Sequence, residues 1–360
     1  MLYSPLSIKY ALKMLQDGAN GNTYTQINNV VGPLSLPKYN NIDNTLSLAN
    51  GIFIRDTYFQ NIKKDYIEVL TNQYNAEVVQ DKFANAKNAN KWIENKTLGI
   101  IKNMLKDNLV QNPDLQMLLI NALAIDMEWK TRFDTKDTHG DTFYLENGTE
   151  MQATMMNDKT SSEAVSYYLD KNLTALSMDL QDYDGVQMEF LALMPQDNIE
   201  QYIKELNIEK IEDIAKKLKK ASDTAGGVRL KIPKFSFDYD LKLKQDLIEM
   251  GITDAFNPDL ANLSKMADIQ KTGKNLYVSD ALHKANIDFT EKGVKAAAVT
   301  VFAVMEATAM VERIEPIEVT INKPFVFIIR DKKNKEIWFT GTVYEPNSWE
   351  NDKAQYEMRY

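Results

Sequence analysis

The stretch EKGVKAAAVTVFAVMEATAMVERIEP, residues 291–316, decides how the rest of this chain is interpreted. Its composition is typical of a β-strand, because Gly293 and three alanines lead into a β-branched and aromatic run without proline before Pro316. In an extended chain the side chains alternate between two faces. The even-numbered face is almost wholly apolar and consists of Val294, Ala296, Ala298, Thr300, Phe302 and Val304. Taken alone, the stretch predicts a buried strand or an Ala-rich helix.

Length and composition are those of a globular protein. The chain has 360 residues, of which 44% are hydrophobic and 26% charged, and this is enough to bury a large core. Its net charge of −9 argues against nucleic-acid binding, which uses clustered basic surface. No apolar run approaches the length of a membrane span, and residues 1–5 do not resemble a signal peptide. We therefore expect no nucleic-acid or membrane partner.

The residue types that support catalysis are scarce. The chain contains no cysteine and only two histidines, His139 and His283. Thiol catalysis and disulfides are excluded, and a His-rich zinc site is not expected. Neither a phosphate-binding glycine motif nor a nucleophile elbow is present. We predict that the protein is not an enzyme and uses no cofactor or metal.

Periodicity predicts an α+β chain. Ser4 and Pro5 indicate a helix start, because serine caps free backbone N–H groups and proline fits the first turn. Further helices are predicted over residues 24–31, 65–74, 86–105, 198–218 and 241–250. Strands are predicted over residues 46–54, 117–129, 150–157, 165–169, 173–180, 186–194, 228–237, 320–330 and 337–344. The strand over 117–129 is apolar enough to be central. We expect one domain, followed by a polar, flexible tail over 347–360.

A series of short motifs adds a family resemblance. They are SPLSI (4–8), LANGIFI (48–54), NKWIENKTLGII (90–101), NALAIDMEW (121–129), IPKFSFDYDL (232–241), DALHKANIDFTEKG (280–293), NKPFVFIIRD (322–331) and TGTVYEP (340–346). In this order they resemble the serpin (serine protease inhibitor) superfamily, and the chain looks like an inhibitory microbial-type member without the family's first helix. The resemblance implies one α+β domain over 1–346 with a large mixed central sheet, additional sheets and about eight helices. Residues 291–316 would form an exposed reactive centre loop.

The resemblance implies inhibition by a suicide substrate. A target serine protease, or in some members a cysteine protease, cleaves the loop, which then inserts as a strand into the main sheet while still joined to the protease. The hinge of the loop would comprise Glu291, Gly293, Val294, Lys295, Ala296, Ala297, Ala298 and Thr300. Val294 and Lys295 depart from the family's usual threonine or serine and glutamate, but valine buries well and Lys295 would point outward. Each larger apolar side chain buried on insertion is worth roughly 1.5–3 kcal/mol, so the fold with its loop outside is expected to be metastable.

Two more groups of residues follow from the resemblance. A shutter below the centre of the sheet would contain Ser4, Ser7, Asn121 and His283. A breach, where the loop enters the sheet, would contain Trp129 and an ion pair between Lys234 and Glu291. The contribution of such a pair depends on its burial.

Two bonds remain candidates for cleavage. The family's spacing from Glu291 gives Ala307-Thr308, whereas spacing counted back from residues 322–325 gives Arg313-Ile314. Length favours the first bond, since about 15 residues at about 3.3 Å each span roughly 50 Å, close to the diameter of a compact chain of this size. Nearby alternatives are Met305 and Glu306. Ala307 would suit an elastase-like protease and Arg313 a trypsin-like one.

Other expectations concern partners and location. We expect a monomer that forms a covalent acyl complex with its protease. The missing first helix suggests an incomplete N-terminus; the compartment is unknown, with an extracellular or cell-envelope site favoured. The short segment between Gly32 and Leu46 and the acidic charge argue against activation by a polyanion. The alternative function is a non-inhibitory serpin that binds or stores a ligand and never inserts its loop; an unrelated α+β enzyme lacks supporting motifs.

Overall fold

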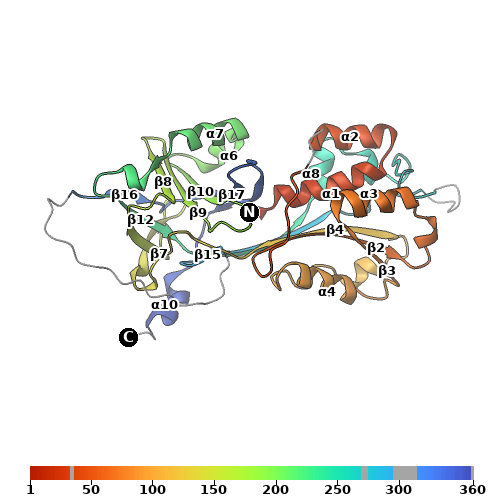
Figure 1. Ribbon diagram of the computed structural model, residues 1–360, viewed down its shortest axis with the longest axis horizontal. Helices are drawn as coiled ribbons and strands as arrows, with labels where there is room; N and C mark the ends of the chain where they lie inside the picture. The colour runs from red at the N-terminus through yellow and green to blue at the C-terminus, as the bar shows by residue number, and fades with distance from the viewer. Residues whose placement is uncertain (33–35, 269–274, 295–313, 358–360) are drawn as a thin grey trace. The chain divides into compact units, whose positions relative to one another are not determined.

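The structure is a computed structural model that describes residues 1–32, 36–268, 275–294 and 314–357 (Figure 1). Its contacts define two compact units. Unit 1 comprises Met1–Leu2, Asp126–Phe237 and Ile287–Tyr360, and unit 2 comprises Tyr3–Ile125 and Asp238–Asn286. The single-domain organisation expected from the sequence stays a prediction.

Unit 2 packs helices on both faces of a three-stranded sheet (Figure 1). In this sheet β2 (Leu46–Arg55) pairs in parallel with β3 (Glu77–Asp81) and antiparallel with β4 (Met117–Ile125). The helices are α1 (Pro5–Gly18), α2 (Gly21–Val31), α3 (Lys64–Tyr74), α4 (Lys87–Lys96), α5 (Asp107–Val110) and α8 (Lys244–Glu249). Helix α1 begins as predicted, since Ser4 Oγ accepts the amide hydrogen of Ser7 at 3.1 Å and Pro5 occupies the first turn.

Two details of unit 2 differ from the sequence prediction. The helix predicted over 86–105 ends at Lys96, where Thr97 Oγ1 donates to the carbonyl of Ile93 and Leu98 takes a positive φ of 54°. A left-handed residue at this position ends a helix. In the described part of the chain β4 pairs with β2 alone, so the apolar strand predicted to be central lies at the edge of its sheet.

Unit 1 contains a seven-stranded sheet of order β1-β18-β17-β10-β9-β8-β11. Its strands are β1 (Leu2–Tyr3), β18 (Ile337–Val343), β17 (Phe325–Asp331), β10 (Met188–Pro195), β9 (Leu173–Asp179), β8 (Val165–Leu169) and β11 (Lys219–Lys220). The predicted hairpin of β17 and β18 is present. The single helix predicted over 198–218 is two helices, α6 (Ile199–Glu205) and α7 (Ile208–Lys217). Leu206 is extended, and Asn207 caps α7 by accepting the amide hydrogen of Lys210 at 2.9 Å.

A four-stranded sheet in unit 1 carries the C-terminal helix. Its order is β16 (Ile317–Thr320), β12 (Val228–Pro233), β7 (Glu150–Thr160) and β6 (Thr138–Tyr144). Helix α10 (Trp349–Glu357) packs on β6 and β7. The polar tail expected to be flexible is therefore helical over these residues.

The remaining sheet has the order β13 (Phe235–Lys242), β14 (Leu282–Phe289), β15 (Gly293–Val294) and β5 (Met127–Glu128). Phe289, at the end of β14, belongs to an aromatic cluster of unit 1, and its ring lies 4.6 Å from that of Phe235 in β13 and 5.2 Å from that of Trp129. Rings at such separations add to the stabilisation that burial provides. This cluster supports the strand end from which residues 290–294 continue.

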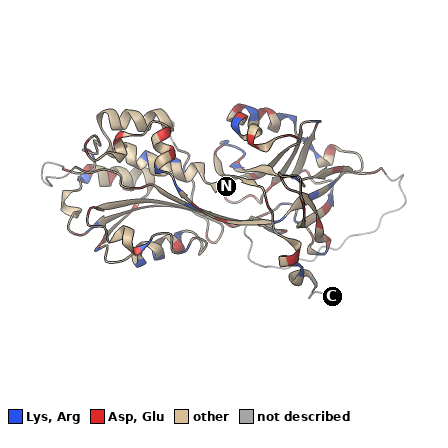
Figure 2. Cartoon of the chain, turned by 180° about the vertical axis from the view of Figure 1, so that it is seen from behind, with Lys and Arg blue, Asp and Glu red and all other residues tan. Residues whose placement is uncertain are grey.

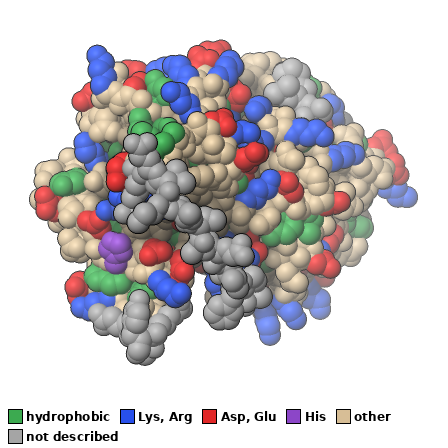
Figure 3. All heavy atoms as spheres, turned by 60° about the vertical axis from the view of Figure 1, so that its left-hand side comes forward, with side chains coloured by type: hydrophobic (Ala, Val, Ile, Leu, Met, Phe, Trp, Pro, Cys, Tyr) green, Lys and Arg blue, Asp and Glu red, His purple; other side chains and the backbone are tan. Residues whose placement is uncertain are grey.

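The described residues show neither a membrane helix nor a metal cluster. No helix among them has both the length and the apolar character to cross a bilayer. They also contain no group of three or more His, Cys, Asp or Glu side chains placed to hold a metal ion. Basic and acidic residues are interspersed along the helices (Figure 2) and over the face of the molecule that Figure 3 shows.

Candidate functional site

The start of the predicted loop is a short strand. In β15, Val294 pairs with Phe289 of β14 and with Met127 of β5, and Gly293 pairs with Glu128. Val294 is 2% exposed. A Cβ on Gly293 would lie 2.1 Å from the carbonyl oxygen of Met127, so the close approach of the strands requires glycine.

The other predicted loop residues lie outside the described residues. They are the hinge residues Lys295, Ala296, Ala297, Ala298 and Thr300, and the cleavage candidates Met305, Glu306, Ala307, Thr308 and Arg313. Ile314, the last cleavage candidate, is described and exposed.

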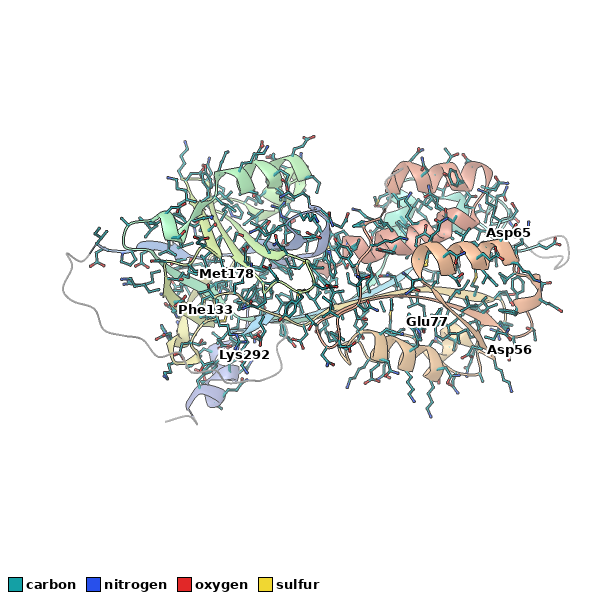
Figure 4. The ribbon with its side chains drawn as sticks, in the orientation of Figure 1. Asp56, Asp65, Glu77, Phe133, Met178 and Lys292 are labelled. Carbon is teal, nitrogen blue, oxygen red and sulfur yellow. The ribbon has the colours of Figure 1, made fainter. Side chains whose placement is uncertain are left out.

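Trp129 holds the turn that precedes β15. Its indole Nε1 donates to the carbonyl of Thr290 at 2.8 Å, and its amide donates to the carbonyl of Lys292 at 2.9 Å. The amide of Phe133 donates to the carbonyl of Glu291 at 3.0 Å, and Figure 4 shows Phe133 and Lys292 in the same part of unit 1. We call residues 290–293 the hinge turn. The turn is held by hydrogen bonds from the indole and the amide of Trp129, which is fully buried, and from the amide of Phe133.

Lys234 and Glu291 form a buried ion pair beside the hinge turn. Lys234 Nζ lies 3.2 Å from Glu291 Oε2. Burial raises the pKa of Glu291, but the Lys234 charge and the Tyr356 hydroxyl outweigh it, so the pKa lies below its ordinary value. Glu291 is therefore a carboxylate, and its charge is compensated inside the protein.

Tyr356 is a third member of this site that the sequence analysis missed. Its hydroxyl donates to Glu291 Oε1 at 2.5 Å and accepts from Lys234 Nζ at 2.5 Å. The Lys234 ammonium also lies 5.1 Å from the centroid of the Tyr356 ring. The spacing of Trp349, Asp352 and Tyr356 places all three on one face of a helix, and this pattern could have revealed the contact.

The residues predicted for a shutter divide into two hydrogen-bonded groups in unit 2. The Ser4 amide donates to His283 Nε2 at 3.0 Å, and Ser4 Oγ caps the amide of Ser7. Burial lowers the pKa of His283 to about 4, in agreement with a neutral ring that accepts at Nε2.

Asn121 belongs to the second group. Its Nδ2 donates to Asn50 Oδ1 at 2.9 Å, and Asn50 in turn donates to the carbonyl of Tyr74 at 2.8 Å. Asn121 Oδ1 is buried and has no hydrogen-bond partner among the residues that the structure describes. Asn50 was not predicted, although it lies in the LANGIFI motif and directly opposite Asn121 in the β2–β4 ladder.

The protein has a mixed α/β fold. In one of its sheets, Gly293 and Val294 form a two-residue strand, β15, between β14 and β5. The model of the serpin (serine protease inhibitor) family matches residues 1–346. A serpin-like protein of Methanosarcina acetivorans is 30% identical, over 96% of this chain and 81% of the relative. A leukocyte elastase inhibitor of Xenopus tropicalis is 28% identical, over 96% of this chain and 93% of the relative.

A solved structure agrees with these relatives. The native state of the thermophilic serpin tengpin has a TM-score of 0.78 and 30% identity, over 96% of this chain and 88% of that structure. The chain belongs to the serpin family and has the serpin fold, as predicted. Serpins are in general protease inhibitors that work through a conformational change, so target proteases are the partners that the family implies.

Proposed function

We propose that this serpin traps a serine endopeptidase as a suicide substrate, with residues 291–316 as the bait loop. The observation that carries the proposal is the register of β15. Val294, the first apolar residue of the bait stretch, is buried opposite Phe289 in an antiparallel ladder. The loop therefore already begins as the strand that insertion would extend.

The same register can be continued along β14. In an antiparallel ladder each step forward on one strand is a step backward on the other, so Ala296 would lie opposite Ile287, Ala298 opposite Ala285 and Thr300 opposite His283. These β14 residues are 3%, 1% and 7% exposed. Residues directly opposite one another share a face of the sheet.

The β14–β15 register supports insertion with the even-numbered face inward. From Val294 to Val304 that face carries no charge, whereas Lys295 would lie on the other face. Burial of each larger apolar side chain would stabilise the inserted form by roughly 1.5–3 kcal/mol. A loop held outside the sheet would be a kinetically trapped state, whose release drives the trapping step.

For the target, we propose an elastase-like serine protease that cuts Ala307-Thr308. The small side chain of Ala307 supports this choice, as does the name of the 28% identical leukocyte elastase inhibitor. Met305 and Glu306 are neighbouring candidates for the cut, and Arg313-Ile314 is the trypsin-like one. A cysteine protease is a second possible target class within the family's mechanism.

Incubation with pancreatic elastase, neutrophil elastase and trypsin, followed by SDS gel electrophoresis, tests the proposal. We expect an SDS-stable band at the summed mass with an elastase, and peptide mapping should place the new C-terminus at Ala307. Trypsin serves as the comparison, because a stable band with trypsin and a cut after Arg313 would identify Arg313-Ile314, not Ala307-Thr308, as the cleaved bond. Loops that are clipped while every protease remains active would favour the non-inhibitory alternative.

A further inference from the structure

The C-terminal residues 347–357 form a structured element outside the part of the chain that the serpin family model matches, residues 1–346. We call this element the C-terminal latch. A helix as short as α10 is marginal in water by itself, so its contacts with unit 1 must hold it.

The latch is attached to unit 1 by backbone and side-chain contacts. The amide of Asn347 donates to the carbonyl of Lys234, and the carbonyl of Asn347 accepts from the amide of Thr154, both at 2.9 Å. Thr154 Oγ1 donates to the buried Asp352 Oδ2 at 2.9 Å. A Cβ on Gly140 would lie 2.6 Å from the Trp349 ring, so the glycine makes room for that side chain.

These contacts aim Tyr356 at the hinge turn. The Trp349 and Tyr356 rings stack at 5.5 Å, and the Tyr356 hydroxyl joins both charges of the Lys234–Glu291 pair. Glu291 also accepts the amide of Phe133 through its carbonyl, so one residue is fixed both through its backbone and through its side chain. The latch is thereby connected to a residue that lies immediately before β15.

We propose that the C-terminal latch restrains the hinge turn. In this proposal Tyr356 is a positioning residue that holds residues 290–294 in place through Glu291. The consequence for loop insertion rests on the proposed inhibitory function, whereas the restraint itself does not. With the hydroxyl present, both buried charges have an additional hydrogen bond and the hinge turn opens rarely. Without it, the hinge turn opens more often and the uncleaved loop enters the sheet sooner.

Tyr356→Phe removes the hydroxyl and keeps the ring that packs on Trp349. Tyr168→Phe is the matched control, because Tyr168 lies in β8 of the same unit and its hydroxyl likewise donates to a carboxylate, Asp170 Oδ2, at 2.7 Å. A chain ended at Pro346 removes the whole latch. Hydrogen bonds to charged groups are strong enough that their loss should change local opening by about ten-fold or more.

Amide hydrogen exchange measures the restraint directly. We expect the amides of Trp129 and Phe133 to exchange about ten-fold faster or more in Tyr356→Phe and in the shortened chain, but not in Tyr168→Phe. The amide of Ser7 in unit 2 is the internal reference, since general destabilisation would accelerate its exchange as well. Unchanged exchange at Trp129 and Phe133 in Tyr356→Phe, or an equal change at Ser7, would overturn the proposal.

The functional consequence has a separate readout. The uncleaved protein is held at a moderately raised temperature, and its conversion to a more stable, loop-inserted monomer is followed on urea-gradient gels. We expect conversion to be faster in Tyr356→Phe than in Tyr168→Phe. If no protease is ever trapped, the proposed function fails, yet hydrogen exchange still decides whether Tyr356 restrains the hinge turn.

Discussion

Val294 lies directly opposite Phe289, and both side chains are buried. This pair sets the face that every later residue of the bait stretch would take on insertion, because strand side chains alternate.

Ala298→Arg should convert the inhibitor into a substrate. If the register of β15 continues on insertion, residue 298 would lie opposite Ala285, where an arginine would be buried without a partner, at a cost of several kcal/mol. Ala297→Arg is the matched control, since residue 297 would take the outward face. SDS gels with the trapped protease should lose the stable band in the first variant and keep it in the second. Equal trapping by both variants would show that the register does not continue as proposed.

Lys234→Ala should destabilise the protein strongly. It leaves Glu291 buried without its cation, and breaking a buried ion pair typically costs about 3–5 kcal/mol. Lys216→Ala, which breaks the exposed pair with Asp213, should change the free energy of unfolding by less than about 1 kcal/mol. Urea unfolding at neutral pH measures both. A small effect of Lys234→Ala would mean that water readily reaches Glu291.

Gly293→Ala should destabilise the pairing of β15 with β5. The new methyl group would meet backbone atoms of Met127 and Glu128, which cannot rotate away as a side chain can. Overpacking of this kind costs about 1–3 kcal/mol. Thermal unfolding should show a lower midpoint, and the amide of Trp129 should exchange faster. A wild-type midpoint would imply that β5 and β15 separate without cost.

Acid should destabilise the protein through His283. Its folded-state pKa of about 4 lies below the ordinary 6.5, so the unfolded chain binds the proton more readily. The contribution is complete above pH 6.5 and is lost progressively as the pH falls toward 4. Between pH 7.5 and 5 the loss should be about 2 kcal/mol.

Comparison of urea unfolding for the wild type and His283→Gln isolates this contribution. The comparison is needed because burial raises the pKa of Asp158 to about 6, and that group favours the folded state as the pH falls. His139→Gln is the control, since His139 is exposed. The pH dependence should shrink in His283→Gln alone; an equal change in both variants would remove His283 as its source.

Much of the fold could be predicted because hydrophobic periodicity marks it. The strand predicted over 165–169 coincides with β8, and the start of α1 follows from a serine cap before proline. Helix ends were harder to predict. Apolar spacing continues past Lys96 to Ile100 and Ile101, and past Leu206 to Ile211, so the backbone breaks are hidden in the pattern.

Some residues of the candidate site could be predicted from the sequence and others could not. Lys234, Glu291 and Trp129 lie in motifs of the family, and the structure places them around the hinge turn. The latch escaped notice because its buried face contains Asp352 and Tyr356 rather than aliphatic residues, and polar helices do not stand out by hydrophobicity. Asn50 escaped because an amide inside an apolar strand reveals its partner only through strand register.

The position of Trp129 also gives the protein a natural spectroscopic probe. It is one of four tryptophans, and its indole N–H bonds directly to the carbonyl of Thr290 in the hinge turn. The indole proton of this residue should therefore give a nuclear magnetic resonance signal whose shift follows that hydrogen bond. Assignment by Trp129→Phe would allow movement of the hinge to be followed in real time without an added label.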